Sequence, residues 1–572
     1  MHDATPTVRH LVKISAILVG ILAANHFQWT RLEWHLFEQK SYWKTAAFVI
    51  VWMVSVTGPM AAAYSPRTGT RWVYGILLPL LNMANDIHFR IMGEGINLTV
   101  LEKVINNLQL TGQVGVPYLH VVWTPAASAA LMGFGIVLSP KTTLPRVARV
   151  GEWWPVFAGL LASVPIAQNL HHTDGWPGYY VTPTCLVEYV MDRPNSRREE
   201  VSLPLTASGR QATHLVLIID ESVRGDFIDL NGEWDTTPWL KAQRGIVNFG
   251  LSTAARNCSA ESNLVLRSGA NPRQLYQKDR TILNNPSIWK YARLAGYRSV
   301  YIDGQMPQGR LHSYMTFEEE QLIDEFVYMS TKPIPAYGRD VEAAKLVQQY
   351  LRSSTPTLVI LNKYGIHFHY EHSYPQGQDV FRPHLDANEF PVDRTRMVNS
   401  YRNAARWAVD HFLRTLLEGA DLSRSVIIYT SDHGQNLLED GKPATHCRVQ
   451  NPTPQEAIVP LLVFTRMEAL RMSFQAAADT NRNRTSHFQI FPTLLILMGY
   501  RPEDVVDRYY LSLLDSVTEE LGFLSGGAFR DSKWNRIDVS KHATGTAEES
   551  RAGGTALRPL SPPNVSGPAP RF

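Results

Sequence analysis

The chain has 572 residues, a net charge of +3 and only three cysteines. This length exceeds one simple core and predicts two domains, and the small net charge argues against nucleic-acid binding as the main activity. Three cysteines are too few for a disulfide scaffold, although they allow one bridge. No zinc-finger spacing is present, so any metal must rely on carboxylate, imidazole and hydroxyl ligands.

The first 170 residues hold five apolar stretches that are candidates for membrane-spanning helices, each of which needs about 20 apolar residues. They run approximately from Leu11 to Phe27, Ala46 to Tyr64, Trp72 to Asp86, His120 to Ser139 and Trp153 to Gln168. The third is the weakest, because Asn82, Asn85 and Asp86 interrupt it. One such run would fit the core helix of a soluble protein, but five in series predict a five-helix transmembrane domain over residues 1–170.

Basic residues predict how this domain is oriented. They lie at the start of the first stretch, in the second connection and in the fourth connection: Arg9, Lys13, Arg67, Arg71, Lys141, Arg146 and Arg149. The positive-inside rule places these ends in the cytoplasm, so the chain after the fifth stretch lies outside, in the periplasm of a Gram-negative cell. We do not expect cleavage of the first stretch as a signal peptide, because four more follow it and no small-residue cleavage pattern is evident.

Three further segments have a distinct composition. Residues 93–115 carry apolar residues at helical spacing and predict a helix that lies in the membrane interface or packs on the soluble domain. Residues 171–208, with three prolines and the run Arg197 to Glu200, predict a linker with a surface helix that bridges the domains. Residues 540–572 are rich in Gly, Ser, Pro and Ala and are expected to be disordered.

The pattern of residues 209–535 is typical of a water-soluble α/β domain. A continuous apolar strand, Leu215 to Ile219, ends in Asp220 and Glu221, and a later strand of the same kind, from Ser425, ends in Asp432 and His433. Continuous apolar strands are typical of a buried parallel sheet, and ligands bind beyond the carboxyl ends of such strands. The sequence therefore predicts a site at these two strand ends.

The candidate metal ligands come from separate places in this domain. Glu221, Asp432 and His433 follow the two strands, His367 follows another apolar run, and His446 follows the Asp-His turn. Carboxylate and imidazole together form a ligand set for a first-row divalent metal, of which zinc is the usual occupant. Asp220 is an alternative to Glu221 as the ligand.

The candidate nucleophile lies among small residues between Ala254 and Asn263. Ser262 sits where a tight turn enters a helix, and a helix amino terminus favours an anionic phosphoryl group. A neighbouring zinc ion would make its alkoxide accessible near neutral pH. Both Ser262 and Ser259 fit equally the role of a helix cap. Asp303, His369, His372 and His487 also fit structural roles in turns, loops or the core.

The segment Glu221 to Asp226 resembles the first metal motif of the alkaline phosphatase and sulfatase superfamily, and Ser431 to Gly434 resembles its late Asp-His-Gly motif. Five spans followed by an external catalytic domain resemble the membrane phosphoethanolamine transferases that modify lipid A and other envelope glycans. The resemblance implies an alkaline phosphatase-like α/β/α sandwich in the periplasm, anchored in the bacterial inner membrane.

The resemblance also implies roles for single residues. A zinc ion would be held by Glu221, Asp432, His433 and the nucleophile, and Ser262 stands four positions after Cys258, where the family commonly has threonine. His367 and His446 are implied as ligands of the substrate phosphate or of a second metal, and as the catalytic residues that move protons. Asn107 and Thr111 resemble a pair that binds the head group of the lipid donor. Gln435 departs from the glutamate that often follows Asp-His-Gly, and the spacing to His446 is one residue longer.

The activity implied is transfer of phosphoethanolamine from phosphatidylethanolamine, through a phosphorylated serine, to lipid A or another envelope glycan. We expect a monomer in the membrane with no nucleic-acid partner. The alternatives are a phosphoglycerol transferase, a sulfatase-like hydrolase or a membrane-anchored binding or sensor protein with an inactive site. The formylglycine pattern of sulfatases is missing around Cys258, which argues against a sulfatase. The acceptor is not encoded in any motif.

Overall fold

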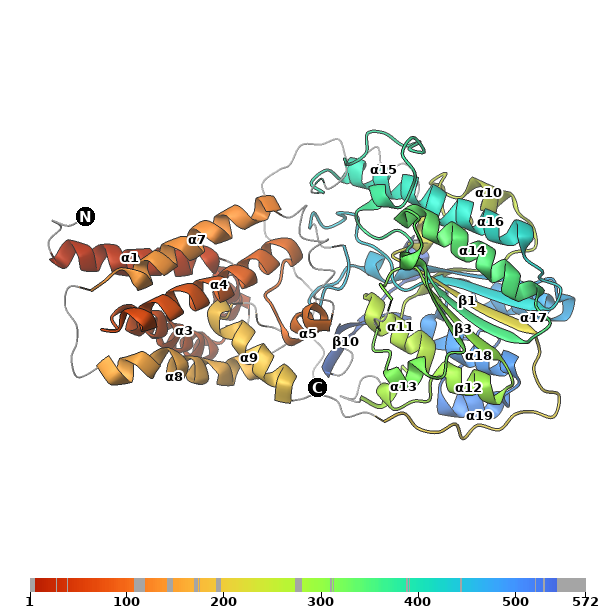
Figure 1. Ribbon diagram of the computed structural model, residues 1–572, viewed down its shortest axis with the longest axis horizontal. Coiled ribbons are helices and arrows are strands. Elements are labelled where there is room, and N and C mark those ends of the chain that lie inside the picture. Colours follow the sequence, from red (N-terminus) through yellow and green to blue (C-terminus); the bar gives the residue numbers. More distant parts are fainter. Residues whose placement is uncertain are drawn as a thin grey trace.

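The computed structural model describes most of the chain from residue 6 to residue 542. The residues within this range that it does not describe are 27, 39, 107–118, 141–147, 169–172, 174, 192–196, 273–279, 309–310, 312, 387–388, 390, 443–444, 520 and 528–529. Asn107, Thr111 and nearly all of residues 540–572 therefore lie outside the described residues. The chain forms an all-helical half and an α/β half, joined end to end (Figure 1).

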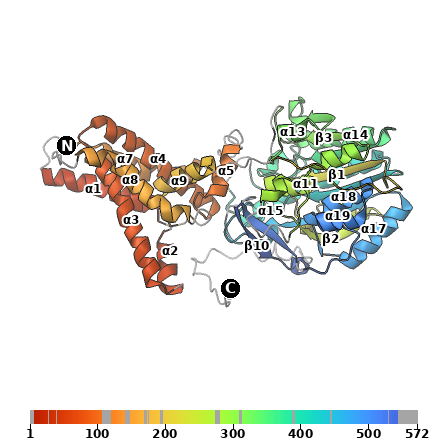
Figure 2. The same ribbon diagram turned by 90° about the horizontal axis from the view of Figure 1, so that it is seen from below.

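The amino-terminal half consists of helices that pack side by side (Figures 1 and 2). The long ones are α1 (Pro6–Ala24), α3 (Tyr42–Ala63), α4 (Thr68–Met92), α7 (Leu119–Val137) and α8 (Ala148–Ala167). The short ones are α2 (Gln28–Glu33), a π-helical turn (Trp34–Glu38), α5 (Leu98–Asn106) and α9 (Gly178–Met191). Each of the five apolar stretches thus forms a helix.

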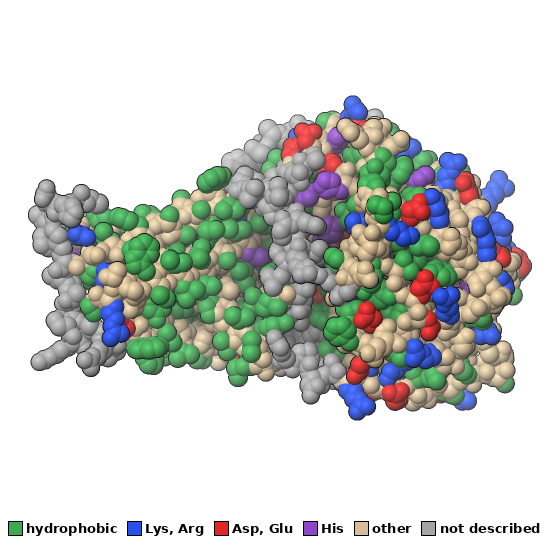
Figure 3. All heavy atoms as spheres, in the orientation of Figure 1, with side chains coloured by type: hydrophobic (Ala, Val, Ile, Leu, Met, Phe, Trp, Pro, Cys, Tyr) green, Lys and Arg blue, Asp and Glu red, His purple; other side chains and the backbone are tan. Residues whose placement is uncertain are grey.

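These helices expose an apolar surface. Large hydrophobic side chains that are more than half exposed come from every long helix: Leu11, Ile50, Trp72, Trp123 and Leu160. In Figure 3 hydrophobic side chains dominate the helical half, whereas charged side chains gather on the α/β half. Among the described residues, Thr7–Ala24 and Tyr42–Ala63 are long and apolar enough to cross a membrane. Membrane crossing by the other three helices remains a prediction.

The carboxyl-terminal half is built on an eight-stranded sheet in the order β4-β3-β5-β1-β6-β7-β2-β8. The strands are β1 (His214–Asp220), β2 (Val247–Thr253), β3 (Arg298–Asp303), β4 (Glu325–Tyr328), β5 (Thr357–Asn362), β6 (Ser425–Ser431), β7 (Ile458–Phe464) and β8 (Thr485–Ser486). Strands β4, β3, β5, β1 and β6 run parallel, whereas β7 is antiparallel to both β6 and β2. This arrangement confirms the predicted α/β class.

Helices cover both faces of the sheet (Figure 1). Val216 and Ile218 of β1 point into one core with α10 (Pro238–Ala242), α14 (Ala336–Arg352), α15 (Arg394–Ala405) and α16 (Phe412–Gly419). Leu215, Leu217 and Ile219 point into the other core, with α11 (Ser259–Ser268), α12 (Ile288–Leu294), α17 (Glu468–Asn481), α18 (Ile490–Met498) and α19 (Pro502–Arg508). Successive side chains of a strand face opposite sides, so a continuous apolar run supplies both cores.

Two segments differ from the sequence expectation. Helix α9 lies inside the predicted linker, and its Tyr179, Tyr180 and Cys185 are buried in the helical half, where α9 contacts α4 and α8. The charged run after it forms no helix, and Arg198 is buried in an ion pair with Glu319. The hairpin of β9 (Gly522–Gly527) and β10 (Arg530–Arg536) was not anticipated, and it lies at the end of the α/β half that faces the helices (Figure 2).

Candidate active site

The site lies where β1 and β6 end side by side. The two strands are parallel, with Asp220 opposite Ser431, so the residues that follow, Glu221 and Asp432, emerge at the same edge of the sheet. The turn after β6 is tight: a Cβ atom on Gly434 would lie 2.1 Å from the carbonyl oxygen of Gln455. Only glycine fits there, which explains the small residue after His433.

Glu221, Asp432 and His433 converge on a common point. Each offers one ligand atom, these atoms lie within 4.8 Å of one another, and all three residues are buried. Nε2 of His433 is 3.5 Å from Oε1 of Glu221 and 3.6 Å from Oδ2 of Asp432. The structure thus brings together three of the residues that the sequence indicated as metal ligands.

The hydrogen bonds of these residues leave the converging atoms available to a cation. The Nδ1–H of His433 donates to the carbonyl of Gly434 at 2.6 Å, which leaves the lone pair on Nε2. Oδ1 of Asp432 accepts from the N–H groups of Ser222 and His433, whereas its buried Oδ2 has no hydrogen-bond partner. Two carboxylates and one imidazole in a buried site fit a zinc ion.

The electrostatics of the site favour a bound cation. Burial, followed by the negative charge of Glu221, raises the pKa of Asp432 well above its usual value. Burial also opposes ionisation of Glu221, but the nearby histidines, His433 first, bring its pKa below the usual value. Two carboxylates held this close without a cation therefore cannot both ionise easily, whereas a divalent ion would favour the charged form of each.

Asp220, the last residue of β1, is held by side chains other than those of the three candidate metal ligands. Its carboxylate pairs with the buried ammonium group of Lys363 and accepts a hydrogen bond from the hydroxyl of Tyr429 at 2.6 Å. Burial raises the pKa of Asp220 to about 6, against the lowering effect of Lys363. Since this carboxylate is already satisfied by its neighbours, Glu221 and not Asp220 is the ligand candidate.

The geometry favours Ser259 over the predicted Ser262 as the candidate nucleophile. The hydroxyl of Ser259, the first residue of α11, lies 3.0 Å from Nε2 of His433 and 3.4 Å from Oε2 of Glu221. The hydroxyl of Ser262 is fully buried and donates to the carbonyl of Arg256 at 2.9 Å. Ser259 is half-buried and stands at the amino terminus of the helix, so it has both the position and the access that the role requires.

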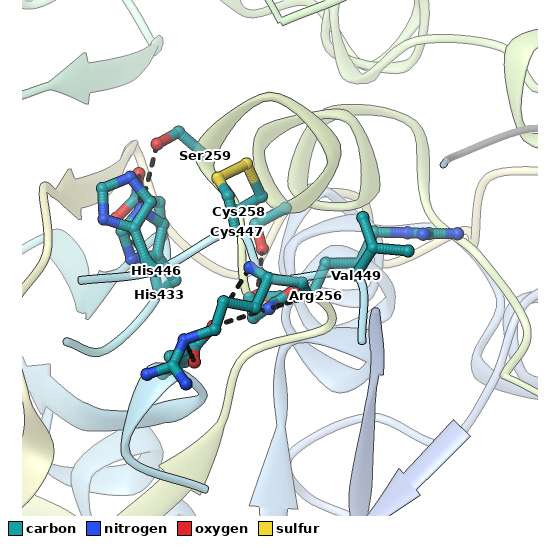
Figure 4. Close-up of a disulfide and its surroundings, with 12 residues drawn as sticks. Arg256, Cys258, Ser259, His433, His446, Cys447 and Val449 are labelled. Atoms are coloured by element: carbon teal, nitrogen blue, oxygen red, sulfur yellow. Dashed lines mark hydrogen bonds and ion pairs between the residues drawn. A yellow bond between two sulfur atoms is a disulfide. The ribbon is translucent and has the colours of Figure 1, made fainter. Parts of the chain in front are cut away.

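A disulfide fixes the turn that carries Ser259. Cys258, the N-cap residue of α11, is bonded to Cys447, which follows His446 (Figure 4). The backbone N–H of Cys447 donates to the carbonyl of Asn257 at 2.8 Å, and the side-chain amide of Asn257 donates to the carboxylate of Glu456 at 2.8 Å. The one bridge that the cysteine count allows is therefore built into the candidate site.

His446 and His367 both stand near the cluster. The ring of His446 stacks on that of His433, with ring centroids 4.2 Å apart (Figure 4), and its Nδ1 lies 3.1 Å from Oε1 of Gln435. Gln435 in turn donates to the hydroxyl of Tyr370 at 2.9 Å, so it orients His446. His367 is half-buried, and its charge is the second largest influence that lowers the pKa of Glu221.

One neighbour of the cluster was missed by sequence reasoning. The side-chain amide of Gln305 donates to Oε2 of Glu221 at 3.1 Å and to the carbonyl of Lys363 at 2.8 Å. Gln305 follows the end of β3, where Asp303 accepts its backbone N–H in a turn. A polar residue just beyond a third parallel strand was the signal available in the sequence.

The chain is similar in sequence to several known proteins. The family model described as Sulfatase matches residues 213–500. The Kdo(2)-lipid A phosphoethanolamine 7''-transferase of Salmonella typhimurium is 25% identical over 347 residues, covering 58% of this chain and 56% of that protein. Phosphoethanolamine transferase EptA of Escherichia coli strain K12 is 23% identical over 323 residues, covering 54% and 56%.

The chain is similar in fold to a solved structure whose match extends over both halves. It is the integral membrane protein lipooligosaccharide phosphoethanolamine transferase A from Neisseria meningitidis, with a TM-score of 0.63 and 17% identity over 88% of this chain and 98% of that one. This likeness shows the fold, and the sequence matches span little more than half the length of the curated relatives. Because the family model covers half of the chain, including both strand ends of the site, the chain belongs to the sulfatase family of the alkaline phosphatase superfamily.

Proposed function

We propose that the protein transfers phosphoethanolamine from phosphatidylethanolamine to lipid A or a related envelope glycan, through a phosphorylated Ser259. The observation that carries this proposal is the meeting of a serine hydroxyl at a helix amino terminus with Glu221, Asp432 and His433. The names of the curated relatives, which describe phosphoethanolamine transferases, supply the chemical class of the group.

The first half-reaction forms a bond between Oγ of Ser259 and phosphorus, and breaks the bond from phosphorus to the glycerol oxygen. A zinc ion held by Glu221, Asp432, His433 and Ser259 would lower the pKa of the hydroxyl and offset negative charge on the phosphoryl oxygens. The amino terminus of α11 directs backbone N–H groups at the same anion. Diacylglycerol leaves with a proton on its oxygen.

The second half-reaction reverses the sequence with a different alcohol or phosphate. The acceptor oxygen loses its proton and bonds to phosphorus, and the bond to Oγ of Ser259 breaks. His446 is suited to move these protons. Gln435 holds its Nδ1, so Nε2 is the atom that would give and take the proton. His367, whose charge acts on Glu221, is the second candidate for this role.

The proposal includes a membrane setting. Helices α1, α3, α4, α7 and α8 would cross the inner membrane, and their exposed apolar side chains would contact lipid. The α/β half then lies in the periplasm, because the basic connections mark the opposite end of the bundle. A lipid donor in the outer leaflet would be within reach of Ser259.

The test uses the full chain in vesicles that contain phosphatidylethanolamine labelled in the ethanolamine, with lipid A as acceptor. We expect label on lipid A together with one diacylglycerol for each transfer, and neither product with Glu221→Gln. Release of labelled phosphoethanolamine into water without labelled lipid A, at every acceptor concentration, would contradict transfer and indicate a hydrolase. No diacylglycerol at all would contradict the donor.

A further inference from the structure

A buried carboxylate, that of Glu94, joins the helical half to the loop of the active site. Glu94 lies just after α4 and is 2% exposed. Its Oε1 accepts the backbone N–H of Val449 at 3.1 Å, and its Oε2 accepts the backbone N–H of Gln450 at 2.8 Å. Both carboxylate oxygens are thus used across the junction, in hydrogen bonds strengthened by the charge of the acceptor.

The segment that carries Glu94 is itself fixed to the helices. Gly93 ends α4 in a left-handed conformation (φ +75°), and its N–H donates to the carbonyl of Phe89 at 2.8 Å. The Nδ1–H of His88 donates to the backbone carbonyl of Glu94 at 2.8 Å, and the N–H of Ile96 donates to the side chain of Asn85 at 2.8 Å. Glu94 therefore moves with α4.

On the other side, the two N–H groups belong to the loop that carries the catalytic candidates. Val449 is two residues from Cys447, whose disulfide to Cys258 adjoins Ser259 (Figure 4). Ser525 of the β9–β10 hairpin donates to the carbonyl of Val449 at 3.1 Å, so the loop is held from both sides. The disulfide and the hydrogen bond from Cys447 to Asn257 tie this loop to the turn of Ser259, so a displacement of Val449 changes the distance between the loop and the helices while the bonds within the site stay in place.

We propose that Glu94 is a positioning residue that fixes the loop of His446 and Cys447 against the end of α4. Without it, the N–H groups of Val449 and Gln450 lose their acceptors and the loop loses its fixed distance from the helices. This inference rests on the proposed function, because the fixed distance serves to present Ser259 to a lipid held by the helical half. Hydrolysis of a small water-soluble phosphodiester, which reaches Ser259 by diffusion, does not need the two halves to be aligned.

The test compares Glu94→Gln with Glu152→Gln, a matched change of a carboxylate in the same bundle that pairs with Arg67 instead. The first measurement is amide hydrogen exchange of the full chain in detergent. We expect Val449 and Gln450 to exchange at least about tenfold faster in Glu94→Gln, since about 1.4 kcal/mol of lost protection is tenfold. Glu152→Gln should leave both amides unchanged.

The second measurement separates positioning from catalysis. Hydrolysis of a soluble p-nitrophenyl phosphodiester should stay within about twofold of the unmodified chain, whereas transfer from phosphatidylethanolamine in vesicles should fall at least about tenfold. Unchanged exchange at Val449 and Gln450, or equal loss of both activities, would overturn the proposal. If Glu94→Gln does not fold, Glu94→Asp replaces it, because aspartate keeps the charge on a shorter side chain. We expect the same faster exchange and the same selective loss of transfer.

Failure of the proposed function gives a different pattern. In that case the unmodified chain transfers nothing from phosphatidylethanolamine, while the exchange rates of Val449 and Gln450 still report whether Glu94 holds the loop.

Discussion

The hydroxyl of Ser259 lies 3.0 Å from Nε2 of His433, within hydrogen-bond reach of a side chain 174 residues away in the sequence. Nδ1 of the same ring donates to the carbonyl of Gly434, so Nε2 carries the lone pair and, with no cation between the two atoms, accepts the proton of the hydroxyl. A zinc ion would take this lone pair and Oγ of Ser259 as two of its ligands. This pairing places a polarised alcohol beside two buried carboxylates. It is the arrangement from which the proposed activity follows.

We predict that Ser259→Ala lowers transfer by on the order of a thousandfold or more, because it removes the atom that bonds to phosphorus. Ser262→Ala should keep its activity and lose about 1 kcal/mol of stability, since only the hydrogen bond to the carbonyl of Arg256 is removed. Both variants are measured in the vesicle assay and by thermal unfolding. An active Ser259→Ala protein would restore the assignment to Ser262.

The choice between Ser259 and Ser262 could not be made from the sequence, for a physical reason. Ser259 and Ser262 are three residues apart, so both lie on the same side of the first turn of α11. Which of them meets the metal ligands depends on where the helix begins and how it is tilted against β6. Both depend on tertiary contacts, including the bond between Cys258 and Cys447, that no local pattern encodes.

Zinc content provides an independent prediction. The full chain should bind one zinc ion at the site of Glu221, Asp432 and His433, and Asp432→Asn should lose it, because the carboxylate with the unpartnered oxygen is gone. Chelation should lower the midpoint of thermal unfolding by on the order of 5 °C in the unmodified chain. An equal response to chelator in Asp432→Asn would place the metal elsewhere.

Other parts of the fold were predictable to different degrees. The five long helices and the strands β1 and β6 followed from long apolar runs, which give the strongest sequence signal. A helix was expected within residues 171–208, but on the surface; the burial of α9 comes from packing on α4 and α8, which no local pattern encodes. Gln305 and Glu94 act through single long-range contacts, for which the sequence carries no periodicity.

Loss of the disulfide should affect both stability and activity. We expect Cys447→Ser to lower the free energy of unfolding by about 2–5 kcal/mol, because the bridge closes a long loop of the unfolded chain. Transfer should fall as well, since the turn of Ser259 loses one of its anchors. The buried Cys185, which is not bridged, serves as the control: Cys185→Ala should leave transfer unchanged. If Cys447→Ser transferred phosphoethanolamine as fast as the unmodified chain, the bridge would not be needed to position Ser259.

The buried His487 predicts a dependence of stability on pH. Burial lowers its pKa to about 3 from 6.5, so the folded state keeps this ring neutral. Below pH 6.5 the unfolded chain binds a proton on this ring and the folded chain does not. The free energy of unfolding should therefore fall by about 1.4 kcal/mol for each pH unit down to about pH 3. Above pH 6.5 this contribution is constant.

The measurement is thermal unfolding of the full chain and of His487→Asn between pH 7 and pH 5. From pH 7 to pH 5, the free energy of unfolding of the unmodified chain should fall by about 2 kcal/mol relative to that of His487→Asn, because the variant has lost the titrating ring. A difference that stays constant with pH would mean that His487 has the same pKa in the folded and the unfolded protein, which would contradict the prediction.

The most direct test of the account is to trap the covalent intermediate and map it. The full chain is incubated with phosphatidylethanolamine in the absence of acceptor, quenched in acid and analysed by tandem mass spectrometry of the peptide from Asn257 to Arg267. The account predicts phosphoethanolamine on Ser259 in the unmodified chain and none in Glu221→Gln. Phosphoethanolamine on Ser262, or on a residue outside this peptide, would contradict it.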